Sequence, residues 1–133
     1  MDTTELQLTT GDRWVTDVTS EAADFVAGRG DGLLHLFAPH ATCGLALFEL
    51  GAGTEPDVAE TLERLLPRDD RWVHRHGSHG HGADHVLPLL VSPSLSIPVV
   101  GGRMALGTWQ SIVLVDTNAD NPRRKLRLSF LAG

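Results

Sequence analysis

Residues 108–117, TWQSIVLVDT, form the longest strand candidate in the chain. They are rich in the β-branched and apolar side chains that fit a pleated, partly buried surface. Residues 118–122 predict a turn, and Arg124–Phe130 then alternates, with Leu126, Leu128 and Phe130 on one face and polar side chains on the other. The C-terminal part of the chain is therefore expected to be β-structure.

Further strands are expected on the N-terminal side of this stretch. Leu33–Ala38 carries apolar residues on both faces, so we expect it to be central and buried. Glu5–Thr9 and Trp14–Val18 flank a Gly11-Asp12 turn and predict a hairpin. The remaining strand candidates are Leu45–Leu50, Leu95–Val100, where Pro98 favours an edge or a bulge, and the short Met104–Leu106.

Helices are expected between the strands. Ser20 is a candidate N-cap for Glu21–Ala27, and Thr54 is one for a helix that Pro67 ends. His85–Leu90 predicts a short third helix. Runs of strands with two or three helices between them indicate one α+β domain, residues 1–133, with mostly antiparallel sheet.

Composition excludes several classes of protein. The net charge of −6 argues against a general nucleic-acid binder. The longest apolar runs, such as Ile112–Val115, are too short to cross a bilayer, and the N-terminus has no signal-peptide pattern. Cys43 is the one cysteine, so no internal disulfide forms, and a reducing, cytoplasmic setting fits. We expect no membrane partner and no nucleic-acid partner.

The stretch WVHRHGSHGHGADH, residues 72–85, holds five of the seven histidines of the chain, separated by small residues. Imidazole is the commonest protein ligand for transition metals, so the stretch predicts a metal-binding loop, and a solvated polar loop is the alternative. His40 follows the break of a buried strand at Pro39 and, with two loop histidines, would supply the three ligands of an open zinc-type site. Glu49 or Asp116 would complete or orient it.

Three further groups of residues each have two interpretations. Cys43 and His40 are close enough for a nucleophilic pair, although a free cysteine is usually a small buried residue. Arg103, Arg123 and Arg124 suit a phosphate group or else an exposed surface. Residues 107–110, GTWQ, would present hydroxyl, indole and amide groups to a ligand, or would pack the indole against a neighbouring subunit.

These motifs together resemble the YjbQ-like family, which is described as a secondary thiamine-phosphate synthase. The resemblance covers nearly the whole chain, and its most specific parts are IPV at 97–99, Gly102-Arg103 and GTWQ at 107–110. It implies an α+β fold with sandwiched sheets and a homotrimer. Its other motifs are LLHL at 33–36, HAT at 40–42, Glu49, EPDV at 55–58, and His74 and His85.

The resemblance also implies site residues. His40, His74 and His85 fall on the recurring histidines of the family and are expected to hold a metal, while Glu49 and Asp116 fall at acidic positions and are expected to be catalytic. The expected substrate-binding residues are Arg103, Thr108, Gln110, Arg123 and Arg124. Phe48 and Leu50 stand where the family has asparagines, and the loop carries histidine and glycine where the family has acidic residues or asparagine.

Three functions follow from these expectations. The first is a weak or secondary thiamine-phosphate-synthase activity, which joins an aminopyrimidine diphosphate to a thiazole phosphate. The second is a metal-dependent hydrolase of a small phosphorylated metabolite, and the third is a non-catalytic trimeric metal-binding protein. Zinc is the expected metal, with magnesium as the alternative for a diphosphate substrate. His76, His79 and His81 are expected to be accessory or solvated.

Overall fold

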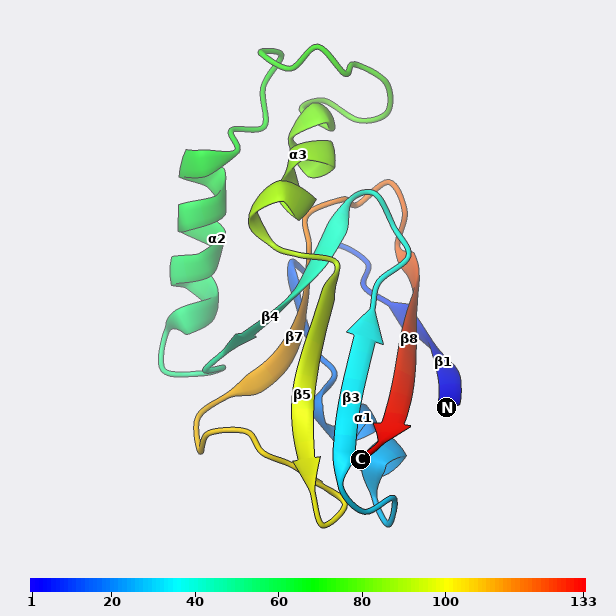
Figure 1. Ribbon diagram of the computed structural model, residues 1–133. Coiled ribbons are helices and arrows are strands. Elements are labelled where there is room, and N and C mark those ends of the chain that lie inside the picture. Colours follow the sequence, from blue (N-terminus) through cyan, green and yellow to red (C-terminus); the bar gives the residue numbers. More distant parts are fainter.

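The computed structural model describes all residues, 1–133. Its elements form a five-stranded sheet, in the order β1-β8-β3-β5-β6, and a three-stranded sheet, in the order β2-β7-β4 (Figure 1). Every strand pair is antiparallel. The strands are β1 (Asp2–Thr9), β2 (Val15–Asp17), β3 (Gly32–Phe37), β4 (Cys43–Phe48), β5 (Ser94–Val100), β6 (Arg103–Met104), β7 (Ser111–Asp116) and β8 (Arg123–Ala132), and the helices are α1 (Thr19–Val26), α2 (Thr54–Leu65) and α3 (Gly82–Leu90). The expected α+β class is confirmed.

Strand β7 explains how the layers are held together. Its side chains alternate between two cores: Ile112 and Leu114 face the five-stranded sheet, whereas Val113 and Val115 pack with residues of α2 and α3. All four are almost completely buried. The apolar run in the sequence is therefore continuous because β7 lies between two hydrophobic layers. Truncating a buried leucine such as Leu114 to alanine costs about 2–5 kcal/mol.

The expected N-terminal hairpin is wrong. Strand β1 pairs with β8 in the large sheet, and β2 pairs with β7 in the small one. The chain crosses between the sheets at Thr10, which is buried and whose backbone N–H donates to the carbonyl of Pro122. The Arg13 guanidinium donates to the carbonyls of Thr9 and Thr10, so the connection is a fixed corner and not a hairpin turn.

The central position of β3 is confirmed, but burial on both of its faces is wrong. The strand lies between β8 and β5, and Leu34 and Leu36 face the core. Leu33 and Phe37, on the other face, are 44% and 41% exposed, because no helix covers that side of the large sheet in this chain. His35 shares this exposed face and pairs its Nδ1 with Ser96 Oγ at 2.9 Å, so it is not a core residue.

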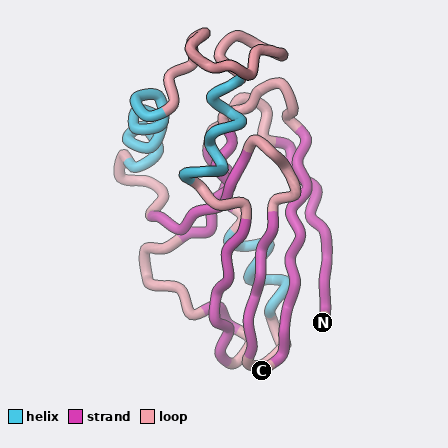
Figure 2. The backbone as a smooth tube through the Cα atoms, turned by 45° about the horizontal axis from the view of Figure 1, so that its top comes forward, coloured by secondary structure: helices cyan, strands magenta, loops and turns pink.

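The three expected helices form with shifted starts. Neither Ser20 nor Thr54 caps a helix through its side chain: α1 follows Val18, and α2 begins at Thr54 after Gly53 in the left-handed region. Helix α3 begins three residues earlier than expected, at Gly82. No helix combines the length and the apolar character needed to span a membrane. The loop between α2 and α3 stands beyond the strand ends in both views (Figures 1 and 2).

Candidate metal centre

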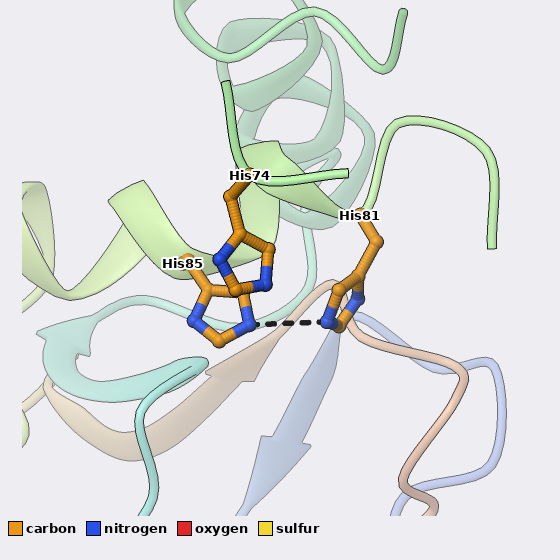
Figure 3. A group of neighbouring side chains, drawn as sticks. All are labelled: His74, His81 and His85. Carbon is orange, nitrogen blue, oxygen red and sulfur yellow. Dashed lines mark hydrogen bonds between the residues drawn. The ribbon is translucent and has the colours of Figure 1, made fainter. Parts of the chain in front are cut away.

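Three histidine rings meet where this loop enters α3 (Figure 3). His74 belongs to the loop, His81 immediately precedes the helix, and His85 lies one turn further along it. Residues four apart share a helix face, so His81 and His85 direct their rings to the same side. Their Nε2 atoms are 3.1 Å apart, and one ring nitrogen from each of the three residues lies within 4.8 Å of the other two.

Close backbone packing brings His74 to this place. At Gly82 a Cβ atom would lie 2.3 Å from the Cβ of Trp72 and 2.7 Å from the carbonyl oxygen of His74, so only glycine fits there. The Trp72 indole N–H donates to the carbonyl of Pro67 at 2.8 Å and anchors the loop. The His74 ring consequently lies 3.9 Å from that of His85, measured between centroids.

A buried carboxylate orients His81. Asp84 is completely buried, and its oxygens accept hydrogen bonds from Thr117 Oγ1 at 2.6 Å and from the Arg68 guanidinium. It also pairs with His81 Nδ1 at 3.1 Å. A carboxylate in this position fixes the proton on Nδ1, which leaves the Nε2 lone pair directed at the histidine cluster. Metal-bound histidines are held in the same way in many proteins.

The electrostatic environment keeps two of the rings neutral. Desolvation lowers the pKa of His74, and the neighbouring His76 and His81 lower it further. Desolvation also lowers the pKa of His85, with added repulsion from His74, His81 and His76 that outweighs the attraction of Asp84. Neutral imidazole is the form that binds a metal ion. Both residues are therefore in the ligand form at neutral pH.

One pair of nitrogens in the cluster has the separation that a tetrahedral ion requires. Two nitrogens about 2.0–2.1 Å from a tetrahedral zinc lie roughly 3.3 Å apart, close to the His81–His85 distance. Three protein ligands leave one coordination position for a substrate. Beside the rings is a cavity of about 170 Å³. Its lining includes Asp69, Asp70, His74, Arg75, His76 and His81.

The structure brings two of the three expected metal ligands together. His74 and His85 meet, but the third member of the group is His81, and His40 is not part of it. His40 lies beside β8, where its Nε2 accepts a hydrogen bond from the Lys125 backbone N–H at 2.9 Å. The solvated position expected of His81 is wrong, since this side chain is only 6% exposed. The spacing of His81, Asp84 and His85 places them on one helix face, but only because α3 begins at Gly82 and not at His85 as expected.

Asp116 and Arg124 form a separate, buried ion pair. The Arg124 side chain donates to Asp116 Oδ2 at 2.6 Å and Oδ1 at 3.0 Å, and also to Thr42 Oγ1 at 2.7 Å. Both residues are at most 3% exposed, and neither lines the cavity. The exposed surface position considered for Arg124 is therefore wrong. Packing and hydrogen bonding within the fold account for both residues.

The other expected site residues do not reach the cavity. Glu49 and Arg123 are exposed, outside its lining. Arg103 belongs to β6, and Thr108 and Gln110 belong to the β6–β7 connection. The β6–β7 connection lies in the half of the molecule away from the histidine loop (Figure 1). Thr108–Gln110 forms a turn and not the start of the strand, which begins at Ser111, and the Gln110 amide oxygen accepts a hydrogen bond from the Gly107 N–H at 2.8 Å.

Cys43 is a buried core residue. Its side chain has no exposed surface, and burial raises the pKa of the thiol to about 12. A thiol that stays protonated at neutral pH is a poor nucleophile. The structure therefore supports the structural interpretation of Cys43 over the nucleophilic pair with His40.

Residues 4–133 match the model of a protein family described as UPF0047 protein YjbQ-like. A UPF0047 protein of Mycobacterium tuberculosis is 56% identical over 133 residues, which is 100% of both chains. The UPF0047 protein YugU of Bacillus subtilis is 30% identical over 127 residues and 92% of each chain. These matches extend across both the sheets and the histidine loop.

Solved structures have the same fold. A hypothetical protein from Aeropyrum pernix superposes with a TM-score of 0.88 at 32% identity, over 100% of both chains. A protein of unknown function from Sulfolobus solfataricus superposes with a TM-score of 0.91 at 19% identity, over 99% of this chain and 97% of the other. The arrangement of two antiparallel sheets with three helices is thus shared between distant sequences.

Proposed function

The chain belongs to the YjbQ-like UPF0047 family, and on that premise we propose that it is a metal-dependent enzyme for a small phosphorylated substrate. His74, His81 and His85 would hold the ion. The observation that carries this proposal is the pair of Nε2 atoms 3.1 Å apart, one of which belongs to a histidine held by the buried Asp84. A solvated loop without function would not require a buried carboxylate to orient one of its histidines.

Zinc is the ion that suits this ligand set best, because imidazole nitrogens in tetrahedral geometry are typical zinc ligands. When bound, it would supply a Lewis acid for a phosphoryl oxygen. The chain's own residues have two further tasks. Asp84 keeps His81 in one tautomer, and Arg75, whose Nε donates to the Trp72 carbonyl, brings positive charge to the cavity wall. That charge would attract a phosphate group.

The specific reaction proposed is that of a thiamine-phosphate synthase, in which an aminopyrimidine diphosphate joins a thiazole phosphate and pyrophosphate leaves. Besides the family resemblance, one feature of the cavity favours a diphosphate substrate. Asp69 and Asp70 line it together with Arg75. Magnesium bound to a diphosphate is usually held by one or two carboxylates. Arg75, with a magnesium ion on Asp69 and Asp70, would then bind the phosphate groups of the substrate, which is the role first expected of Arg103, Arg123 and Arg124.

Hydrolysis of a phosphorylated metabolite is the second candidate. It is favoured by the three-histidine arrangement, which leaves a coordination position open next to a cavity. Non-catalytic metal binding is the third, and the two further exposed histidines of the loop, His76 and His79, favour it. The number of ions bound distinguishes these: an enzyme site holds one tight ion, whereas a buffer holds several weak ones.

We also propose that the chain acts as a homotrimer in the cytoplasm. The uncovered face of the large sheet exposes Leu33, Phe37 and Leu131, and such an apolar row is stabilised by contact with another subunit. Assembly would also let a neighbouring chain bring Arg103, Thr108 and Gln110 near a histidine cluster. The free thiol of Cys43 fits a reducing compartment.

Metal analysis of the purified protein tests the site. We expect one tightly bound zinc per chain, lost in His81→Ala and His85→Ala and retained in the matched control His79→Ala. His40→Ala is an informative fourth variant, because loss of zinc there would restore His40 as a ligand. Equal zinc content in all four variants would refute the site.

A pyrophosphate-release assay with the two thiamine precursors then tests the reaction. Turnover that is present in the wild-type protein and disappears in His85→Ala supports the synthase proposal. Phosphate release from simple phosphate esters, without pyrophosphate release from the precursors, would favour the hydrolase instead.

A further inference from the structure

We propose that His76 is a fourth, displaceable ligand of the metal centre, which closes the coordination sphere until an anionic substrate takes its place. This inference rests on the metal centre proposed above and assigns a role to a loop residue outside the three-histidine group. It makes the site a gated one, in which the ion is protected at rest and opens toward the cavity on substrate binding.

The first support is that the His76 ring lies as close to the cluster as the other three rings lie to one another. His74, His76, His81 and His85 all lie close to one another, with six centroid separations between 3.9 and 5.9 Å. Imidazoles bound to one tetrahedral ion have centroids roughly 3.2 Å from it and so roughly 5 Å from each other. His76 lies 4.1 Å from His74 and 5.4 Å from His81. The nitrogens of His76 are not in the group that lies within 4.8 Å, so the His76 ring would have to turn toward the other three to complete a four-nitrogen shell.

The second support is that the backbone next to His76 is fixed against His81. At Gly77 a Cβ atom would be 2.6 Å from Asp120 Oδ2 and 3.2 Å from the His81 ring, and the φ of 79° also requires glycine. The same Asp120 oxygen accepts a hydrogen bond from the Ser78 N–H at 2.8 Å and lies 3.4 Å from His81 Nδ1. Asp120 thus ties this part of the loop to the histidine cluster.

The third support explains why His76 would leave and His81 would stay. The His81 ring is buried and paired with the carboxylate of Asp84, which strengthens it as a ligand. The His76 ring is exposed, and its only close ring neighbours are the other histidines. An anion arriving in the cavity would gain the coordination position and the charge of Arg75 together. It would therefore compete with His76 and not with His81.

Cobalt loading gives a readout that does not depend on activity. The wild-type protein, His76→Ala and the matched loop variant His79→Ala would each be loaded with Co²⁺, and azide binding would be followed by visible absorption. We expect His76→Ala to keep one Co²⁺ per chain, to show a changed absorption spectrum, and to bind azide at least about tenfold more tightly than wild type. His79 lines the cavity but is not one of the four clustered rings, so His79→Ala should keep one Co²⁺ per chain and the wild-type absorption spectrum.

Two results would overturn the inference while leaving the metal centre intact. A spectrum and an azide affinity in His76→Ala equal to those of wild type would show that His76 is not a ligand. Complete loss of Co²⁺ from His76→Ala would show that it is a permanent ligand and not a displaceable one. Failure of the wild-type protein to bind Co²⁺, or binding unchanged in His81→Ala, would overturn the proposed function and this inference together.

Discussion

Asp84 and Asp116 are both buried carboxylates with an arginine partner, yet they lie in regions of different character. Asp116, at the end of β7, is paired with Arg124 inside the sheets, and both members are almost completely buried. Asp84, in α3, is paired with Arg68 on one side and with His81 on the other, and the His81 ring leads to exposed histidines and a cavity. Thr117, next to Asp116 in sequence, donates to Asp84, so the two networks are neighbours.

The difference lies in where each network ends. The hydrogen bonds of Asp116 end within the fold, at Arg124 and at the backbone N–H of Asn118. Those of Asp84 continue through His81 to His85, whose ring is partly exposed. A closed buried network contributes to specifying and holding a fold, whereas one that ends at an open cavity can orient a ligand. Three experiments use this contrast.

The largest effect is expected at the closed network. Arg124→Met leaves Asp116 as an unpaired buried charge, so the free energy of unfolding should fall by roughly 3–5 kcal/mol in urea denaturation. The adjacent Arg123→Met, at an exposed position, should change it by no more than about 0.5 kcal/mol. The double variant Asp116→Leu with Arg124→Met should regain part of the loss. An unchanged free energy of unfolding in Arg124→Met would mean that the Asp116–Arg124 pair does not stabilise the fold.

An intermediate effect is expected at the open network. Asp84→Asn removes the charge that holds the proton on His81 Nδ1, so zinc affinity should fall about 10- to 100-fold in competition with a chelator. The matched change Asp116→Asn should lower stability and leave zinc affinity unchanged. Equal losses of affinity in both variants would remove the distinction between the two regions.

The smallest effect is expected on the pH dependence of stability. Each network has one histidine with a shifted pKa, His40 beside the closed network and His85 at the end of the open one. Burial lowers the pKa of His40, with Arg124 as the next cause, and burial lowers the pKa of His85, with His74 as the next cause. Below the ordinary value of 6.5 the unfolded chain then binds more protons than the metal-free folded chain. This contribution to stability is complete above that value and is lost as the pH falls through the folded pKa values.

Urea denaturation of metal-free protein at several pH values between roughly 7 and 5 measures this slope. His40→Gln and His85→Gln should each make it shallower, and the double variant should make it shallower still. An unchanged slope in both single variants would show that these rings titrate normally in the folded protein.

Much of the fold follows from local patterns in the sequence. The alternation in Arg124–Phe130 correctly predicts one buried face of β8, and the apolar run after Ser111 correctly predicts β7. Pairing partners did not follow from such patterns. The short turn at Gly11-Asp12 predicts a hairpin, whereas β1 and β2 belong to different sheets. The prediction failed because a turn signal does not show which distant strand has a free edge.

For the candidate site, the sequence by itself determined which imidazoles are available and the segment that carries them, a glycine-rich loop with five histidines, and the family resemblance pointed to His74 and His85. Only the tertiary structure decided that His81 joins them, that Asp84 orients it, and that His40 lies beside β8 instead. The physical reason is that a metal centre requires nitrogens within a few ångströms of one point. Composition shows which side chains can bind, but their separation depends on where α3, β7 and the loop pack against one another.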